Sequence, residues 1–293
     1  MKSPGAGTVD AVLLQPAIEY RQDLTSRVHT ACDMVSVPRG RAFVVLPERW
    51  PTGYLAIDDY ARTAEDLDGP TVRALGAAAR TTGVHLHAES MVERDPDGRL
   101  YNTSLLFAPD DRLVHTHRKL HLCGSGAKEA DLLEPGNSVR VQETEIGRIG
   151  IVTCYDLSFP EILRMLAEDG AELVLVTATW RADRIAHWRL LVPARALENQ
   201  VHLLACNAIG YQRQVEVGGE SMAVDPWGRV TAASWRWPRA LTGALDPGAV
   251  SRARADPGVL RSPSHRRPGG RRPPGRRPDG REPVRRNHQR RRS

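Results

Sequence analysis

The segment RIGIVTCYDLSFPEILRMLAEDG, residues 148–170, predicts a buried strand followed by a helix, with a cysteine at the end of the strand. Its first part, RIGIVTC, is short and rich in Ile and Val, which is typical of buried strands. Apolar residues then recur at the spacing that places them on one face of a helix: Ile162, Leu163, Leu166 and Ala167. This order favours an α/β fold in which Cys154 lies at the carboxyl end of a strand, where reactive groups gather in such folds.

Apolar runs alternate with helical patterns along most of the chain. PTVRALGAAARTTG (residues 70–83) begins with Pro and ends with Gly, as helices commonly do, and residues 187–200 have a helical apolar period. DPDGRL and APDDRL have the composition of hairpin turns. Ten segments are predicted as strands: residues 11–15, 42–47, 84–90, 103–109, 113–119, 148–154, 172–178, 201–210, 220–226 and 240–246. Together they predict one α/β domain over residues 1–250.

The charge of the chain is divided unevenly. Thirteen Arg and two acidic residues give residues 261–293 a charge of +11. Since the whole chain has a net charge of +6, residues 1–260 carry −5. Residues 251–293, rich in Arg, Pro and Gly, are expected to form a disordered tail. Contact of this tail with nucleic acid is a weaker alternative to a solvated extension.

Several kinds of protein are disfavoured by composition. No segment approaches the roughly 18 to 20 apolar residues of a membrane span, and the N-terminus has no uninterrupted apolar signal region. The four cysteines are widely spaced and include no CxxC pair, so neither a disulfide framework nor a zinc knuckle is indicated. A cytoplasmic protein with reduced thiols is the default expectation.

Two other predicted strands end in charged residues. Glu48 follows the apolar run AFVVLP, and Lys119 closes LVHTHRK. A thiol such as Cys154 attacks carbon as its thiolate, a carboxylate can take the thiol proton and pass it to a leaving amine, and an ammonium group can stabilise an oxyanion. Taken alone, Cys154 could be a buried core thiol, and Glu48 and Lys119 could be solvated loop residues. A catalytic role is indicated only if the three belong to one pattern.

That pattern resembles a known family. VLPE at Glu48, HRKLHL at Lys119 and CYDLSFPE at Cys154 occur in the order found in the nitrilase superfamily of carbon-nitrogen hydrolases, and the chain is similar to that family from about Val9 to Asp246. The resemblance implies a four-layer αββα sandwich, a homodimer, and a triad of Glu48 as general base, Lys119 as oxyanion stabiliser and Cys154 as nucleophile. Further similar segments are DGPTVRAL, DGRLYNTSLLF, ARALENQ, ACN and GGESMAVDPWGRV.

Two supporting residues follow from the same resemblance. The backbone N–H of Tyr155 is expected to share the oxyanion with Lys119. EADLLEPG resembles a pattern that carries a second active-site glutamate, here Glu129, with Leu133 in place of the usual Phe. The implied chemistry passes through a thioester on the cysteine and requires no metal or organic cofactor.

The substrate expected from the resemblance is a small linear amide. Members that hydrolyse nitriles tend to carry Trp-Glu after the cysteine, whereas this chain has Tyr155-Asp156, so an ω-amidase-like reaction is favoured. N-carbamoyl amino acids and nitriles are the alternative substrates. Trp180 and Arg181 are the candidate substrate contacts, and Lys128 or Arg184 are further cations for a substrate carboxylate.

Other polar residues receive structural interpretations. His115, His117 and His121 alternate along one predicted strand face, but Lys119 shares that face and its charge would repel a cation, so no metal site is predicted. Asp156 is expected to cap the helix that follows Cys154.

A non-catalytic scaffold of the same fold is the competing hypothesis. Two departures from the family favour it. In residues 29–43, Pro38 interrupts any helix, and ARADPGVLRSPSHRRP stands where the family usually has a C-terminal segment that helps to form the dimer. The presence of all three triad residues argues against it, so we expect an enzyme.

Overall fold

The computed structural model describes residues 8–17, 23–36, 43–53, 55–123, 129–237 and 239–256. The chain divides into two compact units, Met1–Leu260 and Arg261–Ser293, and every described residue belongs to the first. The predicted tail lies outside the described residues from 257 onward, so its disorder and the boundary at residue 250 stay predictions. Among the described residues, no helix has both the length and the apolar character that crossing a membrane requires.

Two six-stranded sheets form the centre of the first unit. The first has the strand order β14-β1-β2-β3-β4-β5, the second has the order β13-β12-β9-β8-β7-β6, and β10 and β11 pair as a separate hairpin. In both sheets the central strands are parallel and the outer ones antiparallel. The strands are β1 Val9–Gln15, β2 Phe43–Val45, β3 His85–Arg94, β4 Leu100–Phe107, β5 Leu113–Arg118, β6 Gln142–Thr144, β7 Gly147–Thr153, β8 Leu173–Ala178, β9 His202–Asn207, β10 Ile209–Gln212, β11 Val215–Gly218, β12 Met222–Val224, β13 Val230–Ala233 and β14 Arg239–Leu245.

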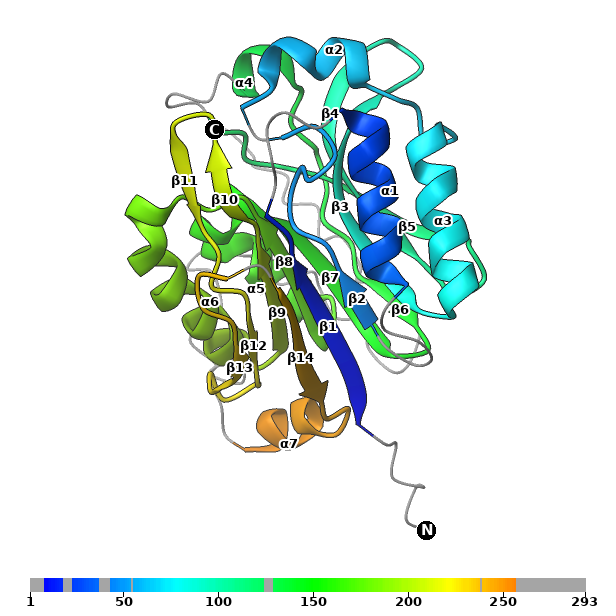
Figure 1. Cartoon of the computed structure of the whole chain (residues 1–293). Coiled ribbons are helices and arrows are strands. Elements are labelled where there is room, and N and C mark those ends of the chain that lie inside the picture. The colour runs from blue at the N-terminus through cyan, green and yellow to red at the C-terminus, as the bar shows by residue number, and fades with distance from the viewer. Residues whose placement is uncertain are drawn as a thin grey trace, which may run out of the picture. The chain divides into compact units, whose positions relative to one another are not determined.

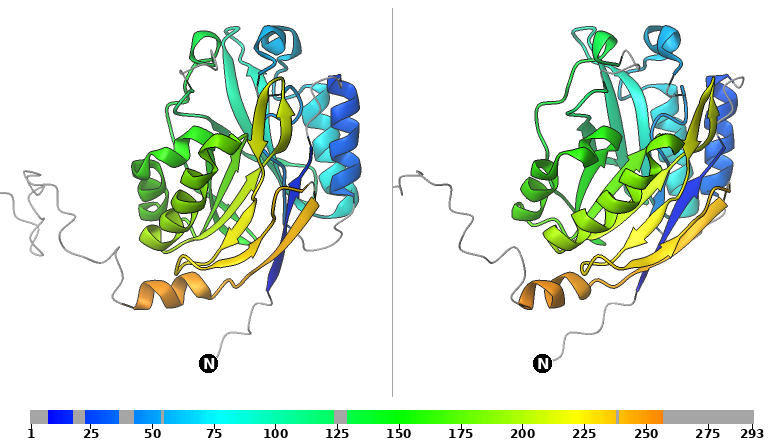
Figure 2. Two further views of the ribbon diagram at one scale, coloured as in Figure 1. Left: turned by 60° about the vertical axis from the view of Figure 1, so that its left-hand side comes forward. Right: turned by 90° about the vertical axis from the view of Figure 1, so that its left-hand side faces the viewer.

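Helices cover the outer face of each sheet. Figure 1 shows α1 and α3 on the side of the first sheet and α5 and α6 on the side of the second, and the turned views of Figure 2 show the same layers. The α-helices are α1 Leu24–Val35, α2 Tyr60–Thr63, α3 Pro70–Thr82, α4 Glu129–Leu132, α5 Pro160–Glu168, α6 Ile185–Asn199 and α7 Ala249–Ala255, and the 3-10 helices are η1 Ile57–Asp59, η2 Cys154–Ser158 and η3 Ala182–Arg184.

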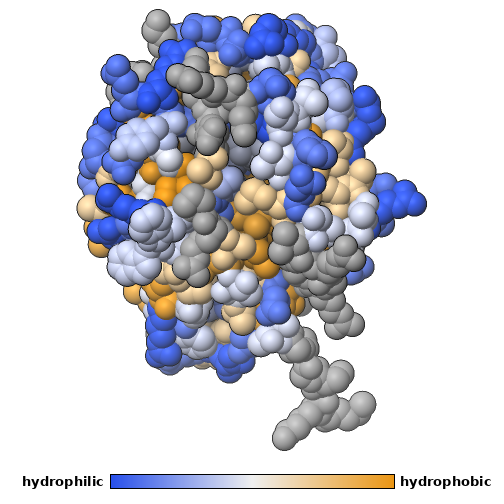
Figure 3. Space-filling model, viewed as in Figure 1, coloured by the Kyte–Doolittle hydropathy of each residue, from blue (hydrophilic) through white to orange (hydrophobic). Residues whose placement is uncertain are grey.

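Side-chain alternation along the strands explains the four layers. In β1, Ala11 and Leu13 pack between the sheets, whereas Val12 and Leu14 pack under α1 and α3. Because both faces of these strands are covered, the strands are continuous apolar runs rather than alternating ones. On the face shown in Figure 3, hydrophilic residues occupy most of the rim and hydrophobic residues show mainly toward the middle. The predicted four-layer αββα sandwich is confirmed.

The sequence predictions were incomplete at short or edge elements. The run predicted as one strand over residues 201–210 is two strands, β9 and β10, because Ala208 between them leaves the sheet. Three strands and four helices were not predicted, namely β6, β11, β13, α1, α2, α4 and α7. Most of these are shorter than the window in which a period is detectable.

Helix α1 was missed for a different reason. It lies in the segment in which Pro38 was expected to interrupt a helix, but it ends at Val35, before that proline. The Asp23 side chain accepts a hydrogen bond from the Ser26 N–H at 2.8 Å and caps its first turn. The departure from the family over residues 29–43 therefore does not prevent a helix as far as Val35, and residues 37–42 lie outside the described part of the chain.

Candidate active site

The three residues expected at strand ends come together at one end of the sandwich. Glu48 follows β2, Lys119 follows β5, and Cys154 follows β7, so two of them come from the first sheet and one from the second. The Lys119 Nζ donates a hydrogen bond to Glu48 Oε1 at 2.9 Å. Glu48 is 0 % exposed, Lys119 1 % and Cys154 8 %, so two full charges lie next to a thiol with almost no access to water.

Cys154 has an unusual backbone conformation. It is the first residue of η2, and its φ is +47°, in the left-handed region that residues with a side chain rarely adopt. Such a conformation costs of order 1 kcal/mol or more and persists where the surrounding structure holds it in place. Here β7, parallel to β8, holds the preceding residues, and the turn places the thiol beyond the end of the sheet.

Glu129, on the short helix α4, completes a cluster of charges with Glu48 and Lys119. Lys119 Nζ lies 3.1 Å from Glu129 Oε2, and the backbone N–H of Cys123 donates to the same oxygen at 3.0 Å. Asn102 in β4 links the two carboxylates, because its Nδ2 lies 3.1 Å from Glu48 Oε1 and 3.0 Å from Glu129 Oε1. Asn102 was not singled out from the sequence as a site residue.

The second sheet orients Glu48 from the opposite side. The Thr179 N–H donates to Glu48 Oε2 at 3.0 Å, and the Thr179 hydroxyl donates to the Glu48 backbone carbonyl at 2.8 Å. Thr179 directly follows β8, the strand next to β7. The Glu48 carboxylate is therefore held in a single orientation between the two sheets.

Arg49 adds a second buried cation to the cluster. It is 1 % exposed, its guanidinium donates to Glu129 Oε1 and to the Tyr60 hydroxyl, and it lies over the Tyr60 ring. We call Glu48, Arg49, Asn102, Lys119 and Glu129 the catalytic cluster. The sequence analysis missed Arg49, and the available signal was weak, since an Arg after VLPE is usually expected in a solvated loop.

The pKa values follow from this arrangement. Burial raises the pKa of Cys154 well above its usual range, the Glu48 carboxylate raises it further, and Lys119 opposes the shift. Burial alone would lower the pKa of Lys119, but Glu129 and Glu48 raise it well above its usual range. Burial would raise the pKa of Glu129, but Arg49 and Lys119 lower it to about 2. Near neutral pH the cluster therefore holds a charged Lys119 and a charged Glu129, and the Cys154 thiol beside it is protonated.

The remaining candidate residues have varied surroundings. Tyr155 is 37 % exposed and its ring packs edge-on against Phe159. Trp180 is buried in the core under α6, where it contacts the Trp188 ring, and its indole N–H donates to the Arg184 carbonyl at 2.9 Å. Trp180 shares this apolar cluster with Cys154, and its part as a substrate contact stays a prediction.

Arg181 lies at the protein surface. Its Nη2 is 2.7 Å from Asp183 Oδ2, and its side chain is 43 % exposed. No described contact brings it to the catalytic cluster. Lys128 lies outside the described residues.

The prediction for Asp156 is wrong. No side chain caps α5, and the Asp156 carboxylate instead accepts the His121 N–H at 2.7 Å and lies 2.9 Å from His121 Nδ1. Because η2 lies between Cys154 and α5, Asp156 is turned toward the segment that follows β5. It thus ties the chain after Lys119 to the chain after Cys154.

The histidines do not form a continuous row on one strand. β5 ends at Arg118, so His121 lies beyond it, stacked on Phe159 at 3.6 Å between ring centroids. Within the described ranges, no group of three or more His, Cys, Asp or Glu side chains is placed to hold a metal ion.

Comparison with known proteins agrees with this geometry. The carbon-nitrogen hydrolase family model matches residues 11–255. A 2-oxoglutaramate amidase of Paenarthrobacter nicotinovorans is 32% identical over 88% of this chain and 90% of its own length, and an omega-amidase NIT2 of Mus musculus is 33% identical over 68% and 75%. The crystal structure of Saccharomyces cerevisiae Nit3, a member of branch 10 of the nitrilase superfamily, is similar with a TM-score of 0.80, at 26% identity over 89% of this chain and 98% of that one.

Proposed function

Because the chain belongs to the carbon-nitrogen hydrolase family, we propose that it hydrolyses small linear amides through a thioester on Cys154. The observation that supports this most directly is the arrangement of Lys119, which lies 2.9 Å from Glu48 and 3.1 Å from Glu129 beside the thiol. This supplies a base, a nucleophile and a fixed positive charge in a site closed to bulk water.

The first half-reaction acylates the cysteine. Glu48 takes the proton of the Cys154 thiol, and the thiolate attacks the amide carbonyl carbon. The ammonium of Lys119 and the N–H of Tyr155 stabilise the oxyanion, and protonated Glu48 then gives its proton to the departing nitrogen. Ammonia leaves and the acyl group remains as a thioester.

The second half-reaction releases the acid. Glu48, again a carboxylate, takes a proton from water as the water oxygen attacks the thioester carbonyl. The tetrahedral intermediate is held by the same donors and expels the Cys154 sulfur, which takes the proton back from Glu48, so the thiol and the carboxylate are restored and the acid leaves. Glu129 has no proton to give in this scheme, because its low pKa keeps it ionised, so its part is to position Lys119.

The proposed substrates are ω-amides of small keto or dicarboxylic acids. The support is the similarity to proteins named 2-oxoglutaramate amidase and omega-amidase, which are 32% and 33% identical to this chain. The Tyr155-Asp156 pair after the cysteine also favours an amide. N-carbamoyl amino acids and nitriles belong in the same assay panel, because each also offers a carbon atom that the Cys154 thiolate can attack.

Ammonia release from this panel tests the proposal. Cys154→Ala should lower kcat/KM by about 10⁴-fold or more, because no other group can form the thioester. Mass spectrometry of rapidly quenched wild-type enzyme should detect the acyl adduct on the Cys154 peptide. Cys32→Ala, at a half-buried thiol on α1, is the matched control and should retain activity. Equal rates for wild type and Cys154→Ala would refute the mechanism, and absence of activity on the whole panel would favour a non-catalytic scaffold.

We also propose that two copies pair through α5 and α6. The support is a set of large apolar side chains exposed on these helices: Met165 at 53 %, Leu197 at 50 % and Leu190 at 70 %. Large apolar side chains exposed on two helices that contact each other are typical of an interface. Leu190→Glu with Leu197→Glu should convert a dimer to a monomer in sedimentation velocity, whereas Val230→Glu, at an exposed residue of β13, should not. A wild-type protein that sediments as a monomer at micromolar concentration would contradict the pairing.

A further inference from the structure

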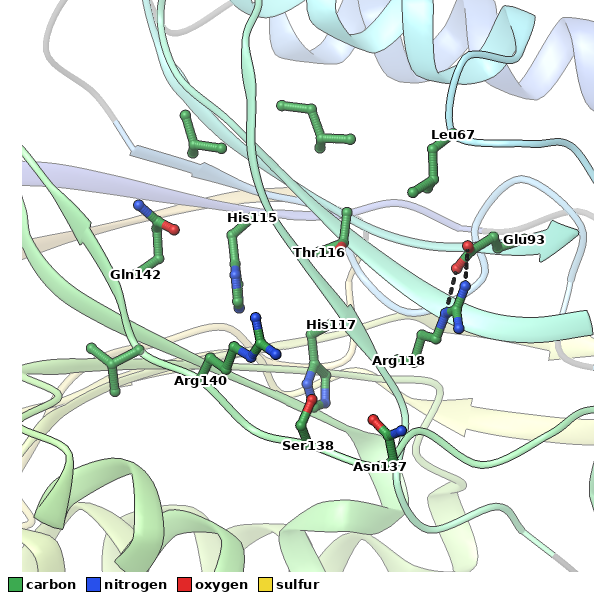
Figure 4. A pocket seen from close by; sticks show the side chains of 13 residues that line it. Leu67, Glu93, His115, Thr116, His117, Arg118, Asn137, Ser138, Arg140 and Gln142 are labelled. Carbon is green, nitrogen blue, oxygen red and sulfur yellow. Dashed lines mark hydrogen bonds and ion pairs between the residues drawn. The ribbon is translucent and has the colours of Figure 1, made fainter. Parts of the chain in front are cut away.

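A pocket of about 510 Å³ lies on the side of the sandwich, away from the triad. One wall is β5, the last strand of the first sheet, and the other is the segment that leads from Asn137 to Gln142 in β6, the last strand of the second sheet. Figure 4 shows the pocket between these two segments. We call it the side pocket; it is lined by Leu67, Glu93, Leu113, Val114, His115, Thr116, His117, Arg118, Asn137, Ser138, Arg140, Val141 and Gln142.

The side pocket carries an uncompensated positive charge. Its only acidic residue, Glu93, is already paired with Arg118 through contacts of 2.6 and 3.0 Å and accepts the Thr103 hydroxyl at 2.5 Å. Arg140 makes no ion pair with any described residue. Figure 4 shows its guanidinium between His115 and His117, far from the Glu93 pair. An anion is therefore the ligand that this charge distribution favours.

The two imidazoles beside Arg140 have unused hydrogen-bonding capacity. The Nε2 atoms of His115 and His117 are buried and have no hydrogen-bond partner among the described residues. The His117 side chain is 2 % exposed, and its Nε2 is 3.7 Å from Asp156 Oδ2, which is too far for a hydrogen bond. Leaving a buried polar atom unpaired costs about 1–3 kcal/mol, which a ligand that pairs with the imidazoles would recover.

We propose that the side pocket binds a small organic anion through a carboxylate or phosphate group, held by Arg140 and the imidazoles of His115 and His117. The guanidinium can bind two oxygens of such a group, and the Ser138 hydroxyl and Asn137 amide offer further donors at the same wall. Leu113, Val114 and Val141 line the remaining space and suit a short aliphatic part of the ligand. A volume of about 510 Å³ is within the usual range for small-molecule sites.

The ligand of this site is an effector rather than a substrate. None of Glu48, Lys119 and Cys154 lines the side pocket. The two sites are nevertheless joined, because β5 continues from Arg118 into Lys119 and the Gly136 N–H donates to the Lys119 carbonyl at 2.8 Å. A ligand that draws residues 137–140 toward β5 therefore acts on the backbone on both sides of the catalytic lysine.

Binding should be accompanied by proton uptake. Burial, together with the neighbouring His117, His87 and Arg140, lowers the pKa of His115 to about 4, so this imidazole is neutral at pH 7. Two carboxylates lie near the imidazoles: Glu93 is paired with Arg118, and Asp156, whose Oδ2 is 3.7 Å from His117 Nε2, accepts the His121 N–H. An anion beside His115 favours its charged form and raises its pKa. Binding should consequently strengthen as the pH falls from 7 toward about 4.

Calorimetric titration of the full chain tests the site, with inorganic phosphate in one arm and succinate in the other. We expect saturable binding below about 10 mM at low ionic strength, with proton uptake seen by repeating the titration in buffers of different ionisation enthalpy. Binding of only one anion would identify the preferred group. Arg140→Met should weaken binding by about tenfold or more, whereas Arg252→Met, at an exposed arginine on α7, should leave it unchanged.

Two results would overturn the proposal. One is the absence of saturable binding in both arms. The other is binding that Arg140→Met and Arg252→Met affect equally, because that would indicate general attraction to a basic surface. The test does not depend on catalysis, so an inactive enzyme could still show the site, and an active one could lack it.

Discussion

Two fully buried carboxylates of the first sheet, Glu48 just after β2 and Glu89 within the neighbouring strand β3, differ in what surrounds them. Glu48 lies at the strand ends and accepts hydrogen bonds from Lys119, Asn102 and the Thr179 N–H. Glu89 lies between the two sheets, 2.9 Å from His87 Nε2 and 2.5 Å from the Thr153 hydroxyl. Both are 0 % exposed, so burial of a charge does not by itself identify an active site.

The difference lies in the neighbouring groups and their position. Glu48 contacts the Cys154 thiol itself, whereas the contact of Glu89 nearest to it in the chain is with Thr153, one residue earlier. His87 helps to lower the pKa of Glu89, against the effect of burial, so Glu89 remains an ionised structural anchor. A buried carboxylate is thus suited to catalysis where it borders both a nucleophile and space for a substrate.

The largest expected contrast is between Glu48→Gln and Glu89→Gln. Glu48→Gln keeps the shape but cannot take a proton, so kcat should fall by about 10³-fold or more. Glu89→Gln should keep kcat within about threefold and lower the free energy of unfolding by about 1–3 kcal/mol, because the buried pair with His87 is weakened. Steady-state ammonia release and urea unfolding measure the two effects. A Glu89→Gln enzyme as inactive as Glu48→Gln would place Glu89 in the reaction itself.

A smaller effect, on stability at acidic pH, is expected when Arg49 is replaced. The pKa of Glu129 is about 2 in the folded protein against a usual value of 4.5, so its ionisation stabilises the fold above pH 4.5 and this stabilisation is lost as the pH falls toward 2. The contribution is about 3 kcal/mol. Arg49→Met should raise the Glu129 pKa and remove roughly half of this pH dependence.

Urea unfolding between pH 2 and pH 5 measures the Arg49 effect. The quantity to compare between variants is the slope of the free energy of unfolding against pH. Arg49→Lys keeps the positive charge and should behave more like wild type. Parallel stability curves for wild type and Arg49→Met would show that Lys119 and the Asn102 and Cys123 donors alone hold Glu129 ionised.

The smallest effect is expected at Thr153. Its hydroxyl donates to Glu89 and lies 3.2 Å from the Ser104 hydroxyl, so it joins the two sheets just before Cys154. Thr153→Val should lower the free energy of unfolding by about 1 kcal/mol, because Glu89 loses one buried donor and keeps the others. Thr153→Ser retains the hydroxyl and should unfold nearly as wild type does. If both variants instead lost activity without losing stability, the role of Thr153 would be to position the thiol.

Much of the fold was predictable from local sequence. Apolar runs flanked by turn residues identified most strands, and a period of 3.6 residues identified α3, α5 and α6. These signals are short-range, so they do not depend on knowing the tertiary structure. Elements of three or four residues, such as β6 and α4, lack enough residues to display a period and were missed.

The candidate site was predictable where a motif marked it. VLPE, HRKLHL, CYDLSFPE and EADLLEPG led to Glu48, Lys119, Cys154 and Glu129, which the structure brings to one end of the sandwich. Asn102 and Arg49 were not predicted, because their importance lies in contacts with residues 54 and 80 positions away. Asp156 was assigned to the wrong partner for the same reason, since its contacts are 35 residues distant.

The sequence by itself determined the family, most of the strand and helix pattern and the candidate triad, because apolar periodicity and short motifs are properties of neighbouring positions. Only the tertiary structure decided that Arg49 balances Glu129, that Asn102 joins the two carboxylates, and that Trp180 packs in the core. It also decided that Arg140 lies between His115 and His117 at the edge of the sandwich. The physical reason is that electrostatic and hydrogen-bond energies depend on distances through space, which a one-dimensional spacing does not contain.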